Sequence, residues 1–90
     1  FEEPDTDRFP SLKLARRAGE IGGTLPAVLN AANEIAVQAF CNRKISFTDI
    51  TTTVSRTMDS HEIIDHPALD EILSADTWAR EAASQILTSA

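Results

Sequence analysis

Residues 25–40 place the strongest constraint on the fold, because their apolar side chains recur at every third or fourth position. The residues on this helical stripe are Leu25, Val28, Leu29, Ala32, Ile35, Ala36, Ala39 and Phe40. Three further apolar residues lie outside it: Ala27, Ala31 and Val37. A helix that is apolar beyond one face is typical of the middle of a bundle. Thr24 is placed to cap it, Pro26 fits its first turn, and we expect it to end near Asn42.

A shorter amphipathic helix is predicted before this segment. It should begin at Pro10, a residue suited to the first helical position, and end at Gly22-Gly23. Its apolar face is expected to comprise Phe9, Leu12, Ala15 and Ala18. Leu14 and Ile21 lie off this stripe, and we interpret the face that bears them as a candidate for packing on another domain.

The rest of the chain continues the helical period. A third helix should be capped by Ser46 or Thr48 and run to about Ser60, with this apolar stripe: Phe47, Ile50, Val54 and Met58. Pro67 is then predicted to open a short helix carrying Leu69, Ile72 and Leu73. Ser74 is expected to cap a separate last helix, with this stripe: Ala75, Trp78, Ala79, Ala82, Ala83 and Ile86.

No strand signal of useful length accompanies these helices, so the predicted fold class is all-α. Pro4 and Pro10 bias Glu3 and Phe9 toward extended backbone. We therefore expect residues 1–9 to form an extended interdomain linker. Residues 10–90 should form a C-terminal bundle domain of about four helices.

Composition excludes several classes of protein. Ninety residues make one domain, and the three glycines match neither a dinucleotide-binding fingerprint nor a phosphate loop. A net charge of −6 argues against a nucleic-acid binder, and no apolar run approaches the length of a membrane span. Cys41 is the only cysteine, so no disulfide forms within the chain, which suits a reducing cytosol.

Few residues suggest chemistry. His61 and Glu62 followed by Asp65 resemble a zinc-protease motif, but Asp65 lies two residues before Pro67, where a helix is poorly supported. We interpret His61 and His66 as solvated loop histidines. Cys41 reads as a small buried or half-buried residue, since a nucleophilic cysteine needs a base and an electropositive setting. We therefore expect no catalytic, cofactor-binding or metal-binding residue in this chain.

Asn30, Asn33 and Glu34 are the most informative polar group, because their spacing places them on one patch of an otherwise apolar helix. One interpretation is that the amides satisfy backbone carbonyls of a neighbouring loop, so that Asn30→Leu would destabilise the bundle by about 1–3 kcal/mol. The alternative is contact with a ligand or another domain. Lys13, Arg16 and Arg17 form a small basic face, interpreted as solvated.

Several strings, in order and over essentially the whole chain, point to one family. They are F-E-E-P-D, R-F-P-S-L-K-L-A, G-G-T-L-P-A-V-L-N-A-A-N-E-I-A-V-Q-A-F, K-I-S-F-T-D-I and L-D-E-I-L-S-A-D-T-W-A-R-E. The chain resembles the C-terminal region of 1-deoxy-D-xylulose-5-phosphate reductoisomerases. The most specific parts are N-A-A-N-E at Asn30 to Glu34 and F-T-D-I at Phe47 to Ile50.

The resemblance implies that this chain is the helical domain of a larger oxidoreductase. The parent enzyme would rearrange 1-deoxy-D-xylulose 5-phosphate and reduce the product to 2-C-methyl-D-erythritol 4-phosphate, in non-mevalonate isoprenoid biosynthesis. It would use NADPH and a divalent metal, magnesium or manganese, and would be a cytoplasmic homodimer. The family's catalytic, metal and cofactor residues lie in its other domains, so the resemblance assigns no such residue here. The partners it implies are the other domains of the same subunit, with no nucleic acid and no membrane.

A second reading of the same residues is a free-standing acidic helical module that binds a partner protein through apolar helix faces. Under that reading the gene would encode only about ninety residues with its own initiator Met.

Overall fold

The computed structural model describes the backbone of residues 10–89 and the side chains of residues 12–88. Four helices follow one another: α1 (Pro10–Ile21), α2 (Leu25–Cys41), α3 (Phe47–Ser60) and α4 (Leu69–Ser89). The described residues contain no strand, which confirms the all-α prediction. The predicted linker at residues 1–9 lies outside the described residues.

The predicted bounds of the first three helices agree with the structure. α1 ends before Gly22 and Gly23, which both adopt positive φ. α2 begins after Thr24 and has Pro26 in its first turn. The N-cap of α3 is Ser46, whose backbone N–H donates a 3.0 Å hydrogen bond to the Asp49 carboxylate. Hydrogen bonds from Ser46 also hold the pKa of Asp49 below its usual value.

The fourth helix corrects one prediction. Instead of a short helix followed by a second one capped by Ser74, a single helix runs without a break from Leu69 to Ser89. Its start is fixed earlier, because the backbone N–H of Ala68 donates a 3.0 Å hydrogen bond to the Glu71 carboxylate. No glycine or proline lies between Leu69 and Ala75 to interrupt the helix, so Ser74 is an interior residue.

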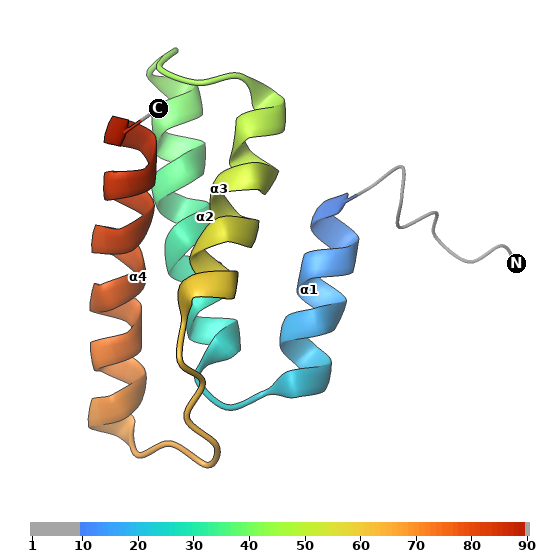
Figure 1. Ribbon diagram of the computed structural model, residues 1–90, viewed down its shortest axis with the longest axis vertical. Helices are drawn as coiled ribbons and strands as arrows, with labels where there is room; N and C mark the ends of the chain where they lie inside the picture. The colour runs from blue at the N-terminus through green and yellow to red at the C-terminus, as the bar shows by residue number, and fades with distance from the viewer. Residues whose placement is uncertain (1–9, 90) are drawn as a thin grey trace, which may run out of the picture.

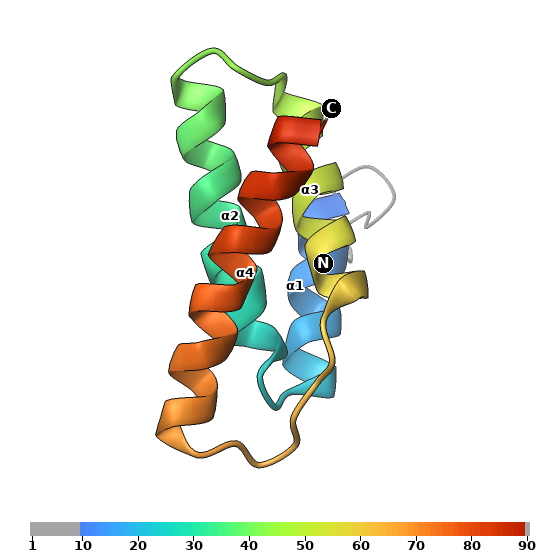
Figure 2. The same ribbon diagram turned by 60° about the vertical axis from the view of Figure 1, so that its left-hand side comes forward.

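α2 is the central element, as its apolar pattern predicts. It packs against each of the other three helices, whereas α1 and α4 make no contact with one another within the described residues. Figure 1 shows this arrangement, with α4 and α1 on opposite sides of the α2–α3 pair. Figure 2, turned by 60°, shows the connection between α3 and α4 passing beneath the end of the bundle.

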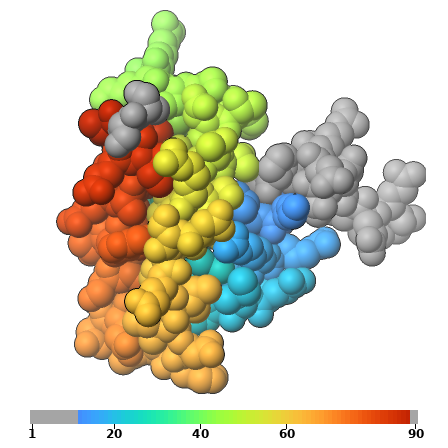
Figure 3. All heavy atoms as spheres, viewed as in Figure 1, coloured from blue at the N-terminus to red at the C-terminus, as the bar shows by residue number. Residues whose placement is uncertain are grey.

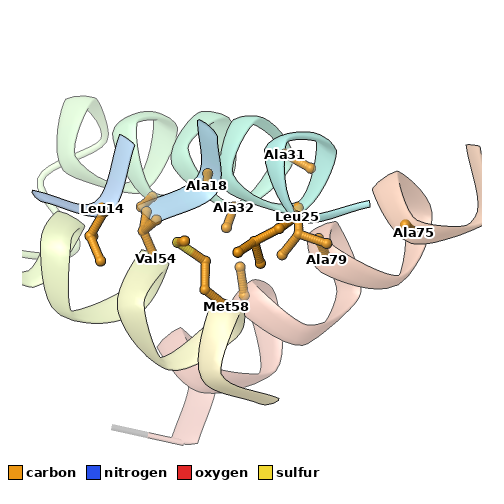
Figure 4. Close-up of a cluster of buried hydrophobic side chains, with 12 residues drawn as sticks. Leu14, Ala18, Leu25, Ala31, Ala32, Val54, Met58, Ala75 and Ala79 are labelled. Carbon is orange, nitrogen blue, oxygen red and sulfur yellow. The ribbon is translucent and has the colours of Figure 1, made fainter. Parts of the chain in front are cut away.

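The core is built mostly from small side chains. Seven of the twelve buried apolar residues are alanines, four of them between residues 18 and 36 and three on α4: Ala18, Ala31, Ala32, Ala36, Ala75, Ala79 and Ala83. Small residues at helix contacts let backbones approach closely, which explains how α4 lies along α2. The larger core residues include Leu25, Val54 and Met58, and Figure 4 shows Met58 extending from α3 into the centre of this cluster.

Two predicted apolar stripes differ from the observed burial. On α1 the buried residues are Leu14 and Ala18, while Leu12 and Ala15 are exposed. Both sets have helical spacing, and the position of α2 and α3 decides which one is covered. The prediction that Leu14 and Ile21 share a face for another domain is wrong for Leu14, which packs in the core of this bundle. Phe9 lies outside the described residues. On α3, Phe47 is 72% exposed and its ring packs against that of Phe40, whereas Val54 and Met58 are buried as predicted.

Candidate functional site

A groove between α1, α2 and α3 brings apolar side chains and two amide side chains together. Its cavity volume is about 290 Å³. The apolar residues that line it are Leu14, Leu29, Ile50 and Val54. The polar side of the lining consists of Asn30 and Asn33 on α2 and Thr51 on α3, and Ala15 of α1 completes it. We call this the α1–α2–α3 groove. Figure 3 shows α1 in blue against α3 in yellow, two of the three helices that line the groove.

Asn30 and Asn33 are exposed, which corrects their interpretation as buried partners of loop carbonyls. Within residues 12–88 neither amide makes a hydrogen bond. Each amide carries one acceptor and two donors, so both remain available for a partner. The alternative interpretation, contact with a ligand or another domain, stays a prediction.

Glu34 does not share a function with the two asparagines. Its carboxylate accepts a hydrogen bond from Arg80 of α4, whose guanidinium also binds Asp76 at 2.9 Å. Hydrogen bonds to Asp76 and then to Glu34 raise the pKa of Arg80 above its usual value. This exposed cluster links α2 to α4, and exposed ion pairs of this kind contribute little to stability.

A second polar arrangement joins the α1–α2 turn to the connection between α3 and α4. The backbone N–H of Thr24 donates to the Ile64 carbonyl at 3.1 Å, and the Ile64 N–H donates to Thr24 Oγ1 at 3.1 Å. Thr24 Oγ1 also lies 2.6 Å from His61 Nε2. We call Thr24, His61 and Ile64 the Thr24 clasp. Thr24 is fully buried, so its hydroxyl serves this tertiary contact and makes no side-chain hydrogen bond as a helix cap.

The environment of His61 corrects its interpretation as a solvated loop residue. Its ring is partly buried and lies against the indole of Trp78, with the ring centroids 5.0 Å apart. The Thr24 hydroxyl can donate one hydrogen bond and accept two, so it accepts from the Ile64 N–H and also pairs with Nε2 in either ring tautomer. Desolvation lowers the pKa of His61, partly offset by Glu62, and this favours the neutral ring.

The remaining candidates are separated from one another. His66 and Asp65 are exposed in the connection before α4, and Cys41 is exposed at the end of α2 rather than buried. Among the described residues, no three His, Cys, Asp or Glu side chains gather closely enough to hold a metal ion. Within residues 10–89, no helix combines the length and apolarity needed to cross a bilayer.

Arg17 is not simply solvated, because it forms a 2.7 Å ion pair with Asp59 of α3. Lys13 and Arg16 are exposed on the same helix, as predicted for the basic face.

Comparison with known families decides what kind of domain carries these features. Residues 1–82 match the family model described as the DXP reductoisomerase C-terminal domain. The chain belongs to this family. The resemblance seen in the N-A-A-N-E and F-T-D-I strings is thereby confirmed.

Named DXP reductoisomerases match almost the whole chain. The enzyme of Desulforamulus reducens is 59% identical over 87 residues, which are 97% of this chain and 22% of the relative. That of Pelodictyon phaeoclathratiforme is 61% identical over 87 residues, again 97% of this chain and 23% of the relative. The DXP reductoisomerase of Zymomonas mobilis, solved in complex with NADPH, superposes with a TM-score of 0.90 and 43% identity, covering 100% of this chain and 24% of that one.

The chain therefore spans about a quarter of the length of the DXP reductoisomerases that it matches. Because the family model describes a C-terminal domain, the other three-quarters of such a polypeptide precede the segment that corresponds to this chain. Other domains of the same subunit are thus implied as its neighbours.

Proposed function

We propose that this chain is the C-terminal structural domain of a DXP reductoisomerase subunit and has no activity alone. The observation that carries the proposal is the match along the whole chain to enzymes about four times its length. The parent activity would be the isomerisation and reduction of 1-deoxy-D-xylulose 5-phosphate to 2-C-methyl-D-erythritol 4-phosphate. NADPH would supply the hydride, consistent with the NADPH complex of the Zymomonas mobilis enzyme.

The domain itself would contribute packing rather than chemistry. Its polar side chains do not bring a nucleophile, a base and an oxyanion site together among the described residues, and the clasp histidine is engaged by Thr24. We assign no catalytic, NADPH-binding or metal-binding residue to it. The divalent metal of the parent, magnesium or manganese, would bind in the domains that precede residue 1.

The proposal extends to the assembly and its location. The parent subunit would form a homodimer in the cytoplasm, where the single exposed thiol of Cys41 stays reduced. Size measurement of the purified complete polypeptide by light scattering tests the dimer directly, because a monomeric mass contradicts it.

The activity is tested with the complete polypeptide that contains these residues. We expect it to oxidise NADPH when 1-deoxy-D-xylulose 5-phosphate and magnesium or manganese are supplied, as followed by NADPH absorbance. A complete polypeptide that folds but leaves NADPH unchanged would contradict the proposal. An open reading frame of only about ninety codons would instead support the free-standing helical module.

The isolated 90-residue chain provides the matching negative experiment. We expect no saturable change in NADPH fluorescence when this chain is titrated. Saturable binding at micromolar concentration would place part of the cofactor site in this domain.

A further inference from the structure

α1 has two apolar edges, and only one of them is covered. Leu14 and Ala18 face the core, whereas Leu12, Ala15 and Gly19 follow the spacing of a second edge and are exposed. Scattered exposed apolar residues are ordinary on a protein surface. This edge differs because Ala15 also lines the α1–α2–α3 groove, so it continues into a concave apolar surface.

The groove also offers directional polar groups. Asn30 and Asn33 lie one helical turn apart on α2, and both amides line the cavity without a hydrogen bond inside the described part of the chain. An apolar cavity beside a few free amide groups resembles the composition of a recognition surface, in which apolar contact gives affinity and hydrogen bonds fix orientation.

The connectivity indicates which partner reaches this groove. In DXP reductoisomerases of known length, three-quarters of the polypeptide precede this domain, and they join it through the segment that leads into α1. The preceding part of the subunit therefore enters this domain through α1, one of the walls of the groove.

Two other exposed apolar sites are less suited to bind the preceding part of the subunit. Leu69 and Leu73 lie on α4, which makes no contact with α1 within residues 10–89, so they do not adjoin the helix through which the preceding chain enters. Phe47 already packs edge-on against Phe40, with ring centroids 5.8 Å apart. Neither site combines an apolar cavity with unpaired amides.

We propose that the α1–α2–α3 groove is where the preceding part of the same subunit docks. The docking segment inserts an apolar side chain between Leu29 and Ile50 and presents main-chain hydrogen-bonding groups to Asn30 and Asn33. The inference rests on the chain being one domain of a longer subunit, as proposed above, but it requires no particular catalytic activity.

Hydroxyl-radical footprinting of the complete polypeptide tests this directly. Leu12 and Leu73 are a matched pair, since they share one side-chain type and are 45% and 59% exposed in this domain. Without docking they should be oxidised at similar rates. With docking on the groove, oxidation of Leu12 should fall roughly tenfold relative to Leu73, because side chains in an interface are removed from water.

A variant pair tests the role of the amides. Replacing both Asn30 and Asn33 by Ala leaves an exposed helix surface with good helical propensity, so the domain itself should remain folded. We expect oxidation of Leu12 to rise toward that of Leu73 in this variant. Gln38→Ala, at an exposed position of the same helix outside the groove, is the control and should keep Leu12 protected.

Equal oxidation of Leu12 and Leu73 in the unaltered polypeptide would overturn the proposal, as would protection of Leu73 with Leu12 exposed. Protection of Leu12 that disappears on dilution would also overturn it, because the occupant would then be a second copy. NADPH oxidation measured on the same sample separates this docking proposal from the proposed enzymatic activity. If Leu12 is protected but the protein does not oxidise NADPH, the proposed activity is wrong and the docking proposal stands.

Discussion

At its carboxyl end α1 leads into a turn closed by hydrogen bonds, whereas its amino-terminal half borders an open groove. The closed end has the Thr24 clasp, in which a buried hydroxyl and two backbone groups bind one another. The amino-terminal half has exposed Leu12 and Ala15, near two amides that make no hydrogen bond among the described residues. The bundle thus fixes the carboxyl end of α1 by its own hydrogen bonds, while the docking proposed above would cover the surface beside the amino-terminal half.

If the closed end stabilises the domain by itself, substitutions there should lower its stability far more than substitutions in the groove. The largest effect is expected at Gly23. Its φ is +59°, and a Cβ at this position would lie 2.4 Å from the Ile64 carbonyl oxygen. We expect Gly23→Ala to lower the free energy of unfolding of the 90-residue chain by about 2–4 kcal/mol, measured by urea denaturation.

Gly22→Ala is the matched control for this substitution. Gly22 also has positive φ, at +72°, but the space around it is open. Gly22→Ala should therefore lower the free energy of unfolding by only about 1–2 kcal/mol, because only the backbone conformation is strained. Equal losses for the two variants would show that the close approach of the Ile64 carbonyl to residue 23 does not add to the cost of the substitution.

The next effect is expected at the hydroxyl of the clasp. Thr24→Val keeps the side-chain shape but leaves the Ile64 N–H and His61 Nε2 without their partner. We expect a loss of about 1–3 kcal/mol in the free energy of unfolding. Thr77→Val should change stability by less than about 0.5 kcal/mol, because Thr77 is exposed and its hydroxyl binds only its own helix. Comparable values for both variants would contradict the role given to Thr24.

A smaller effect should appear as a pH dependence. Desolvation places the pKa of His61 in the folded chain below its ordinary value of 6.5, so the unfolded chain binds the proton more tightly. The free energy of unfolding should therefore fall as the pH drops below about 6.5 and stop falling below the folded-state pKa. Urea denaturation at several pH values, followed by the emission of the single tryptophan, Trp78, measures this.

Replacement of His61 by Asn should reduce this pH dependence. The same substitution at His66, which is exposed in the same connection, leaves the clasp intact and serves as the control. If the His61 variant retained the full pH dependence, the effect would have to come from other groups.

The smallest effect is expected in the groove. Because Asn30 is exposed, Asn30→Leu should change the free energy of unfolding of the isolated chain by no more than about 0.5 kcal/mol. The buried interpretation from the sequence predicts 1–3 kcal/mol instead. A loss in that larger range, by thermal or urea unfolding, would mean that the groove is closed in solution and that the two ends of α1 are alike.

The sequence predicts the helices well because their signals are local and repeated. α2 has eight apolar residues in register, with Thr24 and Pro26 marking its start. The single error in helix number comes from Ser74, a residue type that favours caps but here lies in a helix already started by Glu71 and Ala68. A serine can cap a helix only where the backbone N–H groups that follow it have no partner within the helix, which is the case at a helix start and not in its interior.

What the sequence does not reveal depends on contacts between distant residues. The choice between the two apolar edges of α1 is made by α2 and α3, so helical spacing alone favours Leu12 and Ala15 incorrectly. Likewise, no local pattern indicates that the hydroxyl of Thr24 binds Ile64 and His61. For Asn30 and Asn33 the spacing identifies the right residues, and only the structure shows that they are exposed beside a groove.

The Thr24 clasp should also affect the rate at which the domain unfolds. Thr24 and Ile64 are separated by 40 positions, whereas the helices that make up the bundle form from neighbours three or four positions apart. Closing so long a loop is entropically unfavourable until α2 and α3 already lie together, so we expect the clasp to form in the late steps of folding. Its hydroxyl should then act on the rate of unfolding and leave the rate of folding nearly unchanged, which makes one buried threonine a determinant of the lifetime of the folded domain.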